Sequence, residues 1–370
     1  MKLYTFANKE YKVMEDRFVN SLSDMYELVI KDCTFNKTVG VFSQNVWVTK
    51  TQMIIDAIKE NTGDRIIVSD IDIQFFRPTL PLIQGTSDFL VQKEGDTLCI
   101  GFMIIRCNES MLNFFNKVLI RCQKGEWDQK VINEMKNEIN WEFLPEDIWG
   151  WKKGENPPLN IAAHHATFAF SLEEKLAQMD YIVKYLKIRD AICADGLQSD
   201  TQKPYGIYTK YDKGLPGIWQ YPDELTKLLL LLNDIDFYIH SWESFLEIGT
   251  WFGHTFNFIS KYLLEMNPNT RCVTYDPVAH PIDKLPGLDY RNDFIPKEHY
   301  DFVLIDGDHH YKAIEQDYLE HGRFAKVCAF HDVSNPHCPE AVQYWNDIKK
   351  GKNFVEFKES ELGIGVLINE

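Results

Sequence analysis

The chain has 370 residues, of which 45% are hydrophobic and 25% charged, and its formal net charge at pH 7 is −16. This composition excludes a mainly disordered chain, and the acidic charge argues against general affinity for nucleic acid or an anionic membrane. The length is large for one hydrophobic core and natural for two domains.

In the first half, apolar runs typical of strands alternate with helical patterns, which favours α/β architecture. The expected strands are Lys2–Phe6, Tyr26–Ile30, Arg65–Ser69, Phe89–Gln92 and Ile100–Arg106. The expected helices are Thr49–Glu60, Met111–Cys122 and Ser171–Leu186. The last of these opens on a capping box, because Glu174 follows Ser171 by three residues.

The amino-acid composition then changes, since residues 193–217 are rich in Gly, Pro, Asp, Lys and Ser. We expect a first domain at 1–190, a linker or ordered arm at 191–214 and a second domain at 215–370. In the second domain, expected strands and helices again alternate along the chain. Its expected strands are Ser244–Ile248, Arg271–Tyr275, Tyr300–Ile305 and Lys326–Phe330, and its expected helices are Pro222–Leu232, His254–Met266 and Tyr311–His321.

The eight cysteines form no C-x-x-C pair, and most lie in apolar segments, which predicts buried free thiols and a reducing compartment. Charges interrupt the N-terminal segment too often for a signal peptide. The longest aliphatic run, Leu228 to Leu232, is far too short to span a membrane. These features predict a soluble, cytoplasmic protein (in the host cytoplasm if the chain is viral).

A glycine-bearing turn follows the strand Ser244–Ile248. It has the pattern E-x-G-x-x-x-G, formed by Glu247, Gly249 and Gly253, and a helix begins directly after it. Such a turn offers free backbone amides, and Asp276 at the end of the next strand can bind two ribose hydroxyls. The alternative is a tight strand–helix turn that binds no ligand.

Aspartates and histidines follow two later strands of the same half. They are Asp306, Asp308, His309 and His310 after the first strand, and His331 and Asp332 after the second. Both clusters should lie on the same sheet edge as the glycine turn, although solvated loop residues are the alternative.

From about Leu215 onward the chain resembles class I S-adenosylmethionine-dependent methyltransferases. The resemblance rests on a D-G-x-H-x-Y segment at Asp306, an H-D pair at His331, and a Q-x-P-x-E segment that matches Gln220, Pro222 and Glu224. It implies a Rossmann-like domain that methylates a sugar hydroxyl. It places S-adenosylmethionine against Glu247, Gly249, Gly253, Asp276, Gln220 and Asp306.

By analogy with sugar O-methyltransferases, Asp306 and Asp332, with His331 or Asp308, would hold Mg²⁺. His309 or His310 would then accept the hydroxyl proton. The family often has a glycine pair before its H-D pair, and this chain has Ala325-Lys326-Val327-Cys328 instead.

In the first half, Asp70 and Asp72 directly follow the expected strand Arg65–Ser69. Residues two apart in an extended chain point to the same side, so both carboxylates would face one cavity. Two such oxygen ligands suit Mg²⁺ or Mn²⁺, which neutralises a diphosphate. The alternative is a pair of solvated aspartates at a surface strand end.

This half resembles the nucleotide-diphosphosugar transferases of the glycosyltransferase-A fold. The matching segments, in order, are SDIDIQFFRP, IGFMIIRCNESMLNFF, EWDQKVINEM and NIAAHHATFAF. The resemblance implies a UDP- or GDP-sugar donor, a glycan acceptor, and Mn²⁺ or Mg²⁺ bound by Asp70, Asp72 and a histidine. That histidine is His165 or His164, with His165 favoured.

The sequence leaves two alternative roles for each of two further residues, Lys50 and Asp128. Lys50 is either a contact to the donor diphosphate or an ordinary exposed lysine. Asp128 is either the base of an inverting transferase or a helix N-cap.

The whole chain is therefore expected to be a bifunctional glycan-modifying enzyme. The alternatives are a methyltransferase with a non-catalytic, glycan-binding first domain, and a scaffold with two relic sites. The sequence leaves the oligomeric state, the donor and the acceptor undefined.

Overall fold

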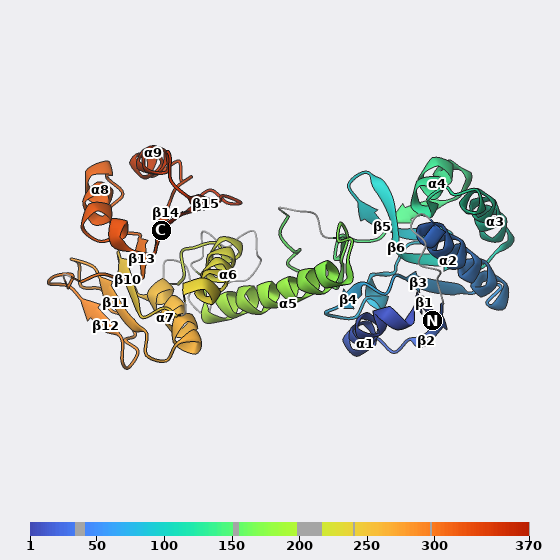
Figure 1. The fold of residues 1–370 in the computed structure, drawn as a ribbon, viewed down its shortest axis with the longest axis horizontal. Coiled ribbons are helices and arrows are strands. Elements are labelled where there is room, and N and C mark those ends of the chain that lie inside the picture. Colours follow the sequence, from blue (N-terminus) through green and yellow to red (C-terminus); the bar gives the residue numbers. More distant parts are fainter. Residues whose placement is uncertain (34–40, 151–154, 198–216, 240, 297, 370) are drawn as a thin grey trace. The chain divides into compact units, whose positions relative to one another are not determined.

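The structure is a computed structural model that describes the chain except residues 34–40, 151–154, 198–216, 240, 297 and 370. It divides into two compact units, Met1–Ile182 and Val183–Glu370 (Figure 1). The division falls within helix α5 (Leu172–Asp195), which continues nine residues beyond the expected end at Leu186. Most of the predicted linker, 191–214, lies outside the described residues.

The first unit is built on a six-stranded mixed sheet. Its strand order is β2 (Glu27–Asp32), β1 (Lys2–Ala7), β3 (Arg65–Ser69), β6 (Thr97–Arg106), β5 (Phe89–Glu94) and β7 (Trp141–Phe143). Strand β1 runs parallel to β2 and β3, whereas β6 is antiparallel to β3 and β5. A small sheet of β4 (Ile73–Phe75), β9 (Ala163–His165) and β8 (Ile148–Gly150) extends from the end of β3.

Both faces of the main sheet are covered by helices (Figure 1). The helices of this unit are α1 (Lys12–Ser21), α2 (Val41–Glu60), α3 (Glu109–Gln123) and α4 (Asp128–Met135). Alternation along β3 sends Ile66 and Val68 into the core under α2, α3 and α4, and Ile67 into the core on the α1 side. The sheet is thus buried on both faces, as its continuous apolar strands predict.

The second unit has a seven-stranded, doubly wound sheet. Its order is β12 (Asp289–Arg291), β11 (Arg271–Tyr275), β10 (Ser244–Ile248), β13 (Phe302–Ile305), β14 (Val327–His331), β16 (Ile364–Ile368) and β15 (Phe354–Phe357). The first five strands are parallel, and β16 is antiparallel to both of its neighbours. Its helices are α6 (Pro222–Ile239), α7 (His254–Met266), α8 (Tyr311–Glu320) and α9 (Pro339–Ile348). Strand order reverses between β10 and β13, where open sheets form their ligand crevice.

The α/β class is confirmed, and so are the longer elements expected from the sequence. Strands β3, β10 and β11 and helix α7 have the expected bounds, and α2 begins eight residues before the expected Thr49. The capping box of α5 is present, because the Glu174 amide donates to Ser171 Oγ (3.1 Å) and the Ser171 amide donates to the Glu174 carboxylate (3.0 Å). The sequence did not predict the three-residue strands, α1, α4, α9 or the terminal β15–β16 hairpin. Within the described part of the chain, 3₁₀ turns lie at Lys9–Tyr11, Leu80–Leu82, Lys136–Glu138 and Gly322–Phe324.

All eight cysteines are free thiols, and seven of them are buried, as expected. Among the described residues, no helix is long and apolar enough to cross a membrane.

Glu224 of α6 holds the loop that precedes β16 in place by hydrogen bonds. Its carboxylate is fully buried and accepts hydrogen bonds from the Ser360 amide (2.9 Å), the Ser360 hydroxyl (2.7 Å) and the Gly363 amide (3.2 Å). This contact, rather than a cofactor, accounts for the glutamate of the Q-x-P-x-E segment.

We expect Glu224→Gln to lower the free energy of unfolding by about 1–3 kcal/mol, because an amide NH₂ would face these donors. Urea unfolding of the full chain measures the effect. The exposed Glu361→Gln, on the same loop, is the matched control. Equal stability of the two variants would contradict the role given to Glu224.

Candidate functional sites

The two aspartates of the first unit lie in a turn, not in a strand. Strand β3 ends at Ser69, and residues 70–72 turn the chain into β4. The expectation that both carboxylates point to one side of an extended segment is therefore wrong. They converge through the turn, and Asp70, Asp72 and His165 each place one ligand atom within 4.8 Å of the others.

His165 reaches this group from β9, which pairs with β4. Its Nε2 lies 3.4 Å from Asp72 Oδ1, while its Nδ1 lies 3.0 Å from Gln92 Oε1. Because a glutamine oxygen only accepts hydrogen bonds, this contact holds the proton on Nδ1 and turns Nε2 toward Asp72. Gly101 packs directly against the His165 ring, since a Cβ at this position would overlap the imidazole.

His164 lies outside this group, because neighbouring residues of β9 point to opposite faces. Its ring packs beside Trp149 with a centroid distance of 5.6 Å, and its buried Nδ1 has no hydrogen-bond partner among the described residues. Burial lowers the pKa of His164 to about 3. Of the two histidines, the structure brings only His165 to the aspartates.

Lys175, from the first turn of α5, is a site residue that the sequence did not reveal. Its Nζ donates to Asp72 Oδ2 and to the carbonyl oxygen of Ala166 (3.2 Å). Burial alone would raise the pKa of Asp72, but His165 and Lys175 outweigh it and hold that pKa below its ordinary range. The capping box fixes where α5 begins, and it could have indicated that Lys175 lies in the first turn.

Lys50 and Asp128 lie on the Asp70 side of the same group. Lys50 Nζ donates to Asp70 Oδ1 (2.6 Å) and to the carbonyl oxygen of Ile100 (2.9 Å). Lys50 is only 4% exposed, so the ordinary surface lysine is excluded. Asp128 is equally buried and is the first residue of α4; the N-cap is Trp127, so the N-cap alternative is also wrong.

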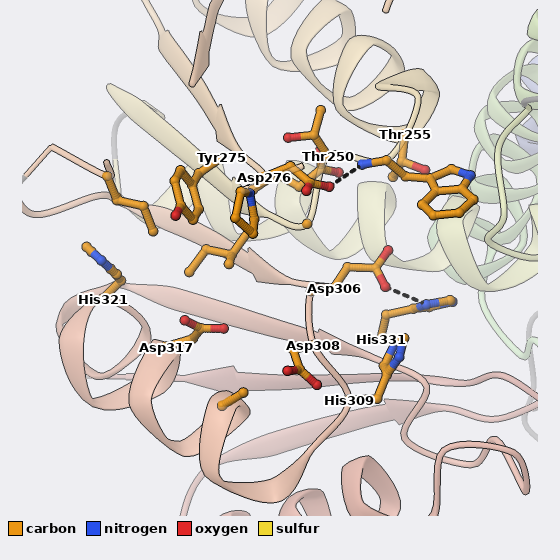
Figure 2. A pocket seen from close by; sticks show the side chains of 18 of the residues that line it. Thr250, Thr255, Tyr275, Asp276, Asp306, Asp308, His309, Asp317, His321 and His331 are labelled. Carbon is orange, nitrogen blue, oxygen red and sulfur yellow. Dashed lines mark hydrogen bonds and ion pairs between the residues drawn. The ribbon is translucent and has the colours of Figure 1, made fainter. Parts of the chain in front are cut away.

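The second unit contains a cleft of about 1410 Å³ at the carboxyl ends of β10, β11, β13 and β14 (Figure 2). Gly249 and Gly253 form its turn with φ angles of +100° and +77°. A Cβ at Gly249 would overlap the carbonyl of Asp306, so the turn requires glycine for space as well as conformation. Gly253 is the N-cap of α7, and the helix N-terminus therefore begins beside the cleft.

Two carboxyl groups line the cleft beside this turn. Asp276 accepts hydrogen bonds from the backbone amides of Trp251 (2.9 Å) and Val278 (2.8 Å). Glu247 is almost fully buried and accepts a hydrogen bond from the Thr274 hydroxyl (3.0 Å), while its Oε1 has no partner among the described residues. Burial, with the nearby Asp306 carboxylate, raises the pKa of Glu247 well above its usual range.

On the side of the cleft opposite the turn, histidine side chains contact aspartate carboxylates and form a polar rim (Figure 2). His331 Nδ1 lies 2.9 Å from Asp306 Oδ1 and 3.3 Å from Asp332 Oδ2. His309 Nε2 lies 2.8 Å from the same Asp332 oxygen. The expected gathering of both strand-end clusters at one edge is thus present.

Two residues expected at this site lie elsewhere. His310 is exposed, pairs with Asp308 and does not line the cleft. Gln220 does not line it either; its Nε2 donates to Asp306 Oδ2 (2.7 Å) and its Oε1 accepts a hydrogen bond from Thr255. Gln220 therefore positions Asp306, and Gly217 and Trp219, just before it in the chain, line the cleft.

Residues 35–179 match the family model of the nucleotide-diphospho-sugar transferases, which confirms that resemblance for the first unit. No curated protein matches the chain in sequence. Similar solved structures include a glycosyltransferase involved in glycosylation of the major capsid of PBCV-1 (10% identity, TM-score 0.38, covering 49% of this chain and 100% of that one).

They also include an SAH-bound methyltransferase from Podospora anserina, with 10% identity and a TM-score of 0.32, covering 41% of this chain and 80% of that one. Another is an O-methyltransferase from Bacillus cereus in complex with SAH, with 14% identity and a TM-score of 0.31, covering 51% of this chain and 91% of that one. The strand order of the second unit, with β16 antiparallel, is that of the class I methyltransferase fold. The first unit thus contains the match to the nucleotide-diphospho-sugar transferase family model, and the second unit has the strand order of the class I methyltransferase fold.

Asp128 should make the stability of the chain depend on pH. Burial raises its pKa to about 6, with Lys50 lowering and Asp70 raising it. An unfolded aspartate titrates near about 3.9. The folded chain therefore holds an additional proton between these pH values, and stability contributed by Asp128 falls as pH rises through them.

We expect Asp128→Asn to remove this fall and to raise the free energy of unfolding at pH 7 by up to about 3 kcal/mol. Urea unfolding of the full chain at pH 4.5 and pH 7 tests it. Asp96→Asn, an exposed change at the β5–β6 turn, is the control. An unchanged pH dependence in Asp128→Asn would show that this carboxyl titrates normally.

Proposed function

We propose that the chain transfers a sugar from a nucleotide-diphosphosugar to a glycan acceptor and methylates a sugar hydroxyl with S-adenosylmethionine. The first activity rests on one observation: Asp70, Asp72 and His165 converge inside the segment that matches the nucleotide-diphospho-sugar transferase family. The second rests on the cleft at the switch point of the second sheet, with its obligatory glycine turn.

The donor set of the first unit fits a divalent cation. Two carboxylates and an imidazole suit Mn²⁺ or Mg²⁺, and Gln92 holds the imidazole in the tautomer that a ligand needs. The ion would be held by Asp70, Asp72 and His165, and when bound it would neutralise charge on the leaving diphosphate.

Two lysine side chains supply further positive charge for the donor diphosphate. Lys175 and Lys50 each lie on one of the two aspartates, so both ammonium groups are within the region where the diphosphate would bind. Asp128, close enough to interact with both Lys50 and Asp70, is the carboxyl placed to accept the acceptor proton if the reaction inverts configuration.

Asp72→Asn should reduce nucleotide release from the active UDP- or GDP-sugar by about 100-fold or more, because it removes an anionic ligand and the partner of Lys175. Lys175→Met should act in the same direction. Asp96→Asn is the matched surface control, and thermal melting verifies that each variant is folded. Full donor turnover by a folded Asp72→Asn variant would exclude the proposed metal site.

In the second unit, S-adenosylmethionine would lie along the cleft. The ribose would face Asp276, the α7 N-terminus would approach the cofactor, and Asp306 would lie at the methyl end. His309, with 43% of its side chain exposed, is the rim imidazole most accessible to an acceptor hydroxyl and would take its proton.

Gly249→Ala should abolish the thermal stabilisation of the chain by S-adenosylhomocysteine, because the new Cβ would overlap the Asp306 carbonyl. Gly351→Ala is the matched control: Gly351 also has a positive φ, +73°, but has open space around its Cβ position. Equal stabilisation of both variants would show that the cofactor binds elsewhere.

A further inference from the structure

A thiol joins the rim of the methyltransferase-type cleft. Cys338, at the N-cap of α9, lines the cleft together with His309 and Asp332. One donor atom from each of the three residues lies within 4.8 Å of the other two. The sequence placed His309 and Asp332 at this edge, but it gave no reason to bring Cys338 to them.

The types of donor atom restrict which ion this triad can bind. Mg²⁺ requires oxygen ligands and keeps much of its hydration, whereas nitrogen and sulfur donors favour Zn²⁺ and similar borderline ions. An imidazole, a carboxylate and a thiolate are all ordinary zinc ligands. The triad therefore differs in chemistry from the neighbouring Asp306, His331 and Asp332 group, with which it shares Asp332.

The shared carboxylate is held in place by the surrounding structure. Asp332 is 4% exposed and has φ +59°, a conformation that non-glycine residues seldom adopt. The side-chain amide of Asn335 donates to its Oδ1 (2.6 Å), which leaves Oδ2 facing His309. Such outer hydrogen bonds are the usual means by which a metal ligand is oriented.

Two imidazoles also contact the shared carboxylate. His309 and His331 both direct a ring nitrogen at Asp332 Oδ2, at 2.8 Å and 3.3 Å. The other ring nitrogen of His331 is buried and has no partner among the described residues. These contacts keep Asp332 Oδ2 beside His309, within reach of an ion held by the triad.

We propose that His309, Asp332 and Cys338 bind a borderline divalent ion of the Zn²⁺ type. All three residues line the cleft, so an ion held by them would be accessible from it, as in catalytic rather than structural zinc sites. The role of this ion, which rests on the proposed methyltransferase function, would be to bind the acceptor hydroxyl and lower its pKa, and His309 would then be a ligand of the ion in place of the proton acceptor.

Cobalt substitution tests the site. The full chain, stripped of metal, is titrated with CoCl₂ in the absence of S-adenosylhomocysteine. We expect visible bands of four-coordinate Co²⁺ and a near-ultraviolet thiolate-to-cobalt band, which Cys338→Ser removes. Zn²⁺ affinity, measured by competition with a chelator, should fall in Cys338→Ser by more than the ~10–100-fold typical of losing an outer-shell partner.

The control is Cys99→Ser, because Cys99 Sγ lies 3.5 Å from His165 Nδ1 in the first unit and is the thiol beside the other proposed metal site. The thiolate band should persist in this variant. A band that survives Cys338→Ser, or that is lost in Cys99→Ser, overturns the proposal.

Binding of S-adenosylhomocysteine separates this inference from the proposed function. If wild type and Cys338→Ser both bind it and no thiolate band forms in the wild type, the metal inference alone fails. Should Cys338→Ser not fold, Cys338→Ala and His309→Asn serve instead, and each should remove the thiolate band or shift the visible spectrum. Unchanged spectra in both would also overturn the proposal.

Discussion

The placement of functional residues in both units depends on one constraint: a buried carboxylate must be compensated by hydrogen-bond donors or by positive charge. An uncompensated buried charge costs several kcal/mol. Asp72 is matched by His165 and Lys175, and Asp332 by His309, His331 and Asn335. In the first unit the compensating groups come from β9 and α5, about a hundred residues later in the chain, so the aspartate turn is complete only when the small sheet and α5 have formed.

The two units meet this constraint with different donor chemistry. In the first, the group around Asp72 is built from oxygen atoms, one imidazole and an ammonium group, which suits hard cations and phosphates. In the second, a thiol and two imidazoles surround Asp332. Aspartates that closely follow a buried strand, Asp72 after β3 and Asp332 after β14, therefore lead to different sites, because the partners supplied by the rest of each fold differ.

Local patterns predicted those features that local physics determines. Strands β3, β10 and β11 follow from continuous apolar runs, and Gly249 follows from a turn that tolerates no Cβ. Gln92, Lys175 and Cys338 could not be predicted this way, because each acts through a contact distant in sequence and has no spacing that marks it. The three-residue strands β4, β8 and β9 are too short to show a period, and nothing in the sequence therefore indicated that the chain turns at Asp70–Asp72 instead of staying extended.

Net charge explains why the proposed donors need different surroundings. With a net charge of −16, the chain as a whole repels a diphosphate, so binding requires strong local cations. Lys50 and Lys175 supply these, and they are kept charged and in place by Asp70 and Asp72. The sulfonium of S-adenosylmethionine, the proposed methyl donor, carries the opposite charge and would be stabilised by the acidic cleft that Asp276, Asp306 and Asp308 line. The aspartates of the first unit thus act partly as anchors for cations, whereas those of the second can attract the proposed donor directly.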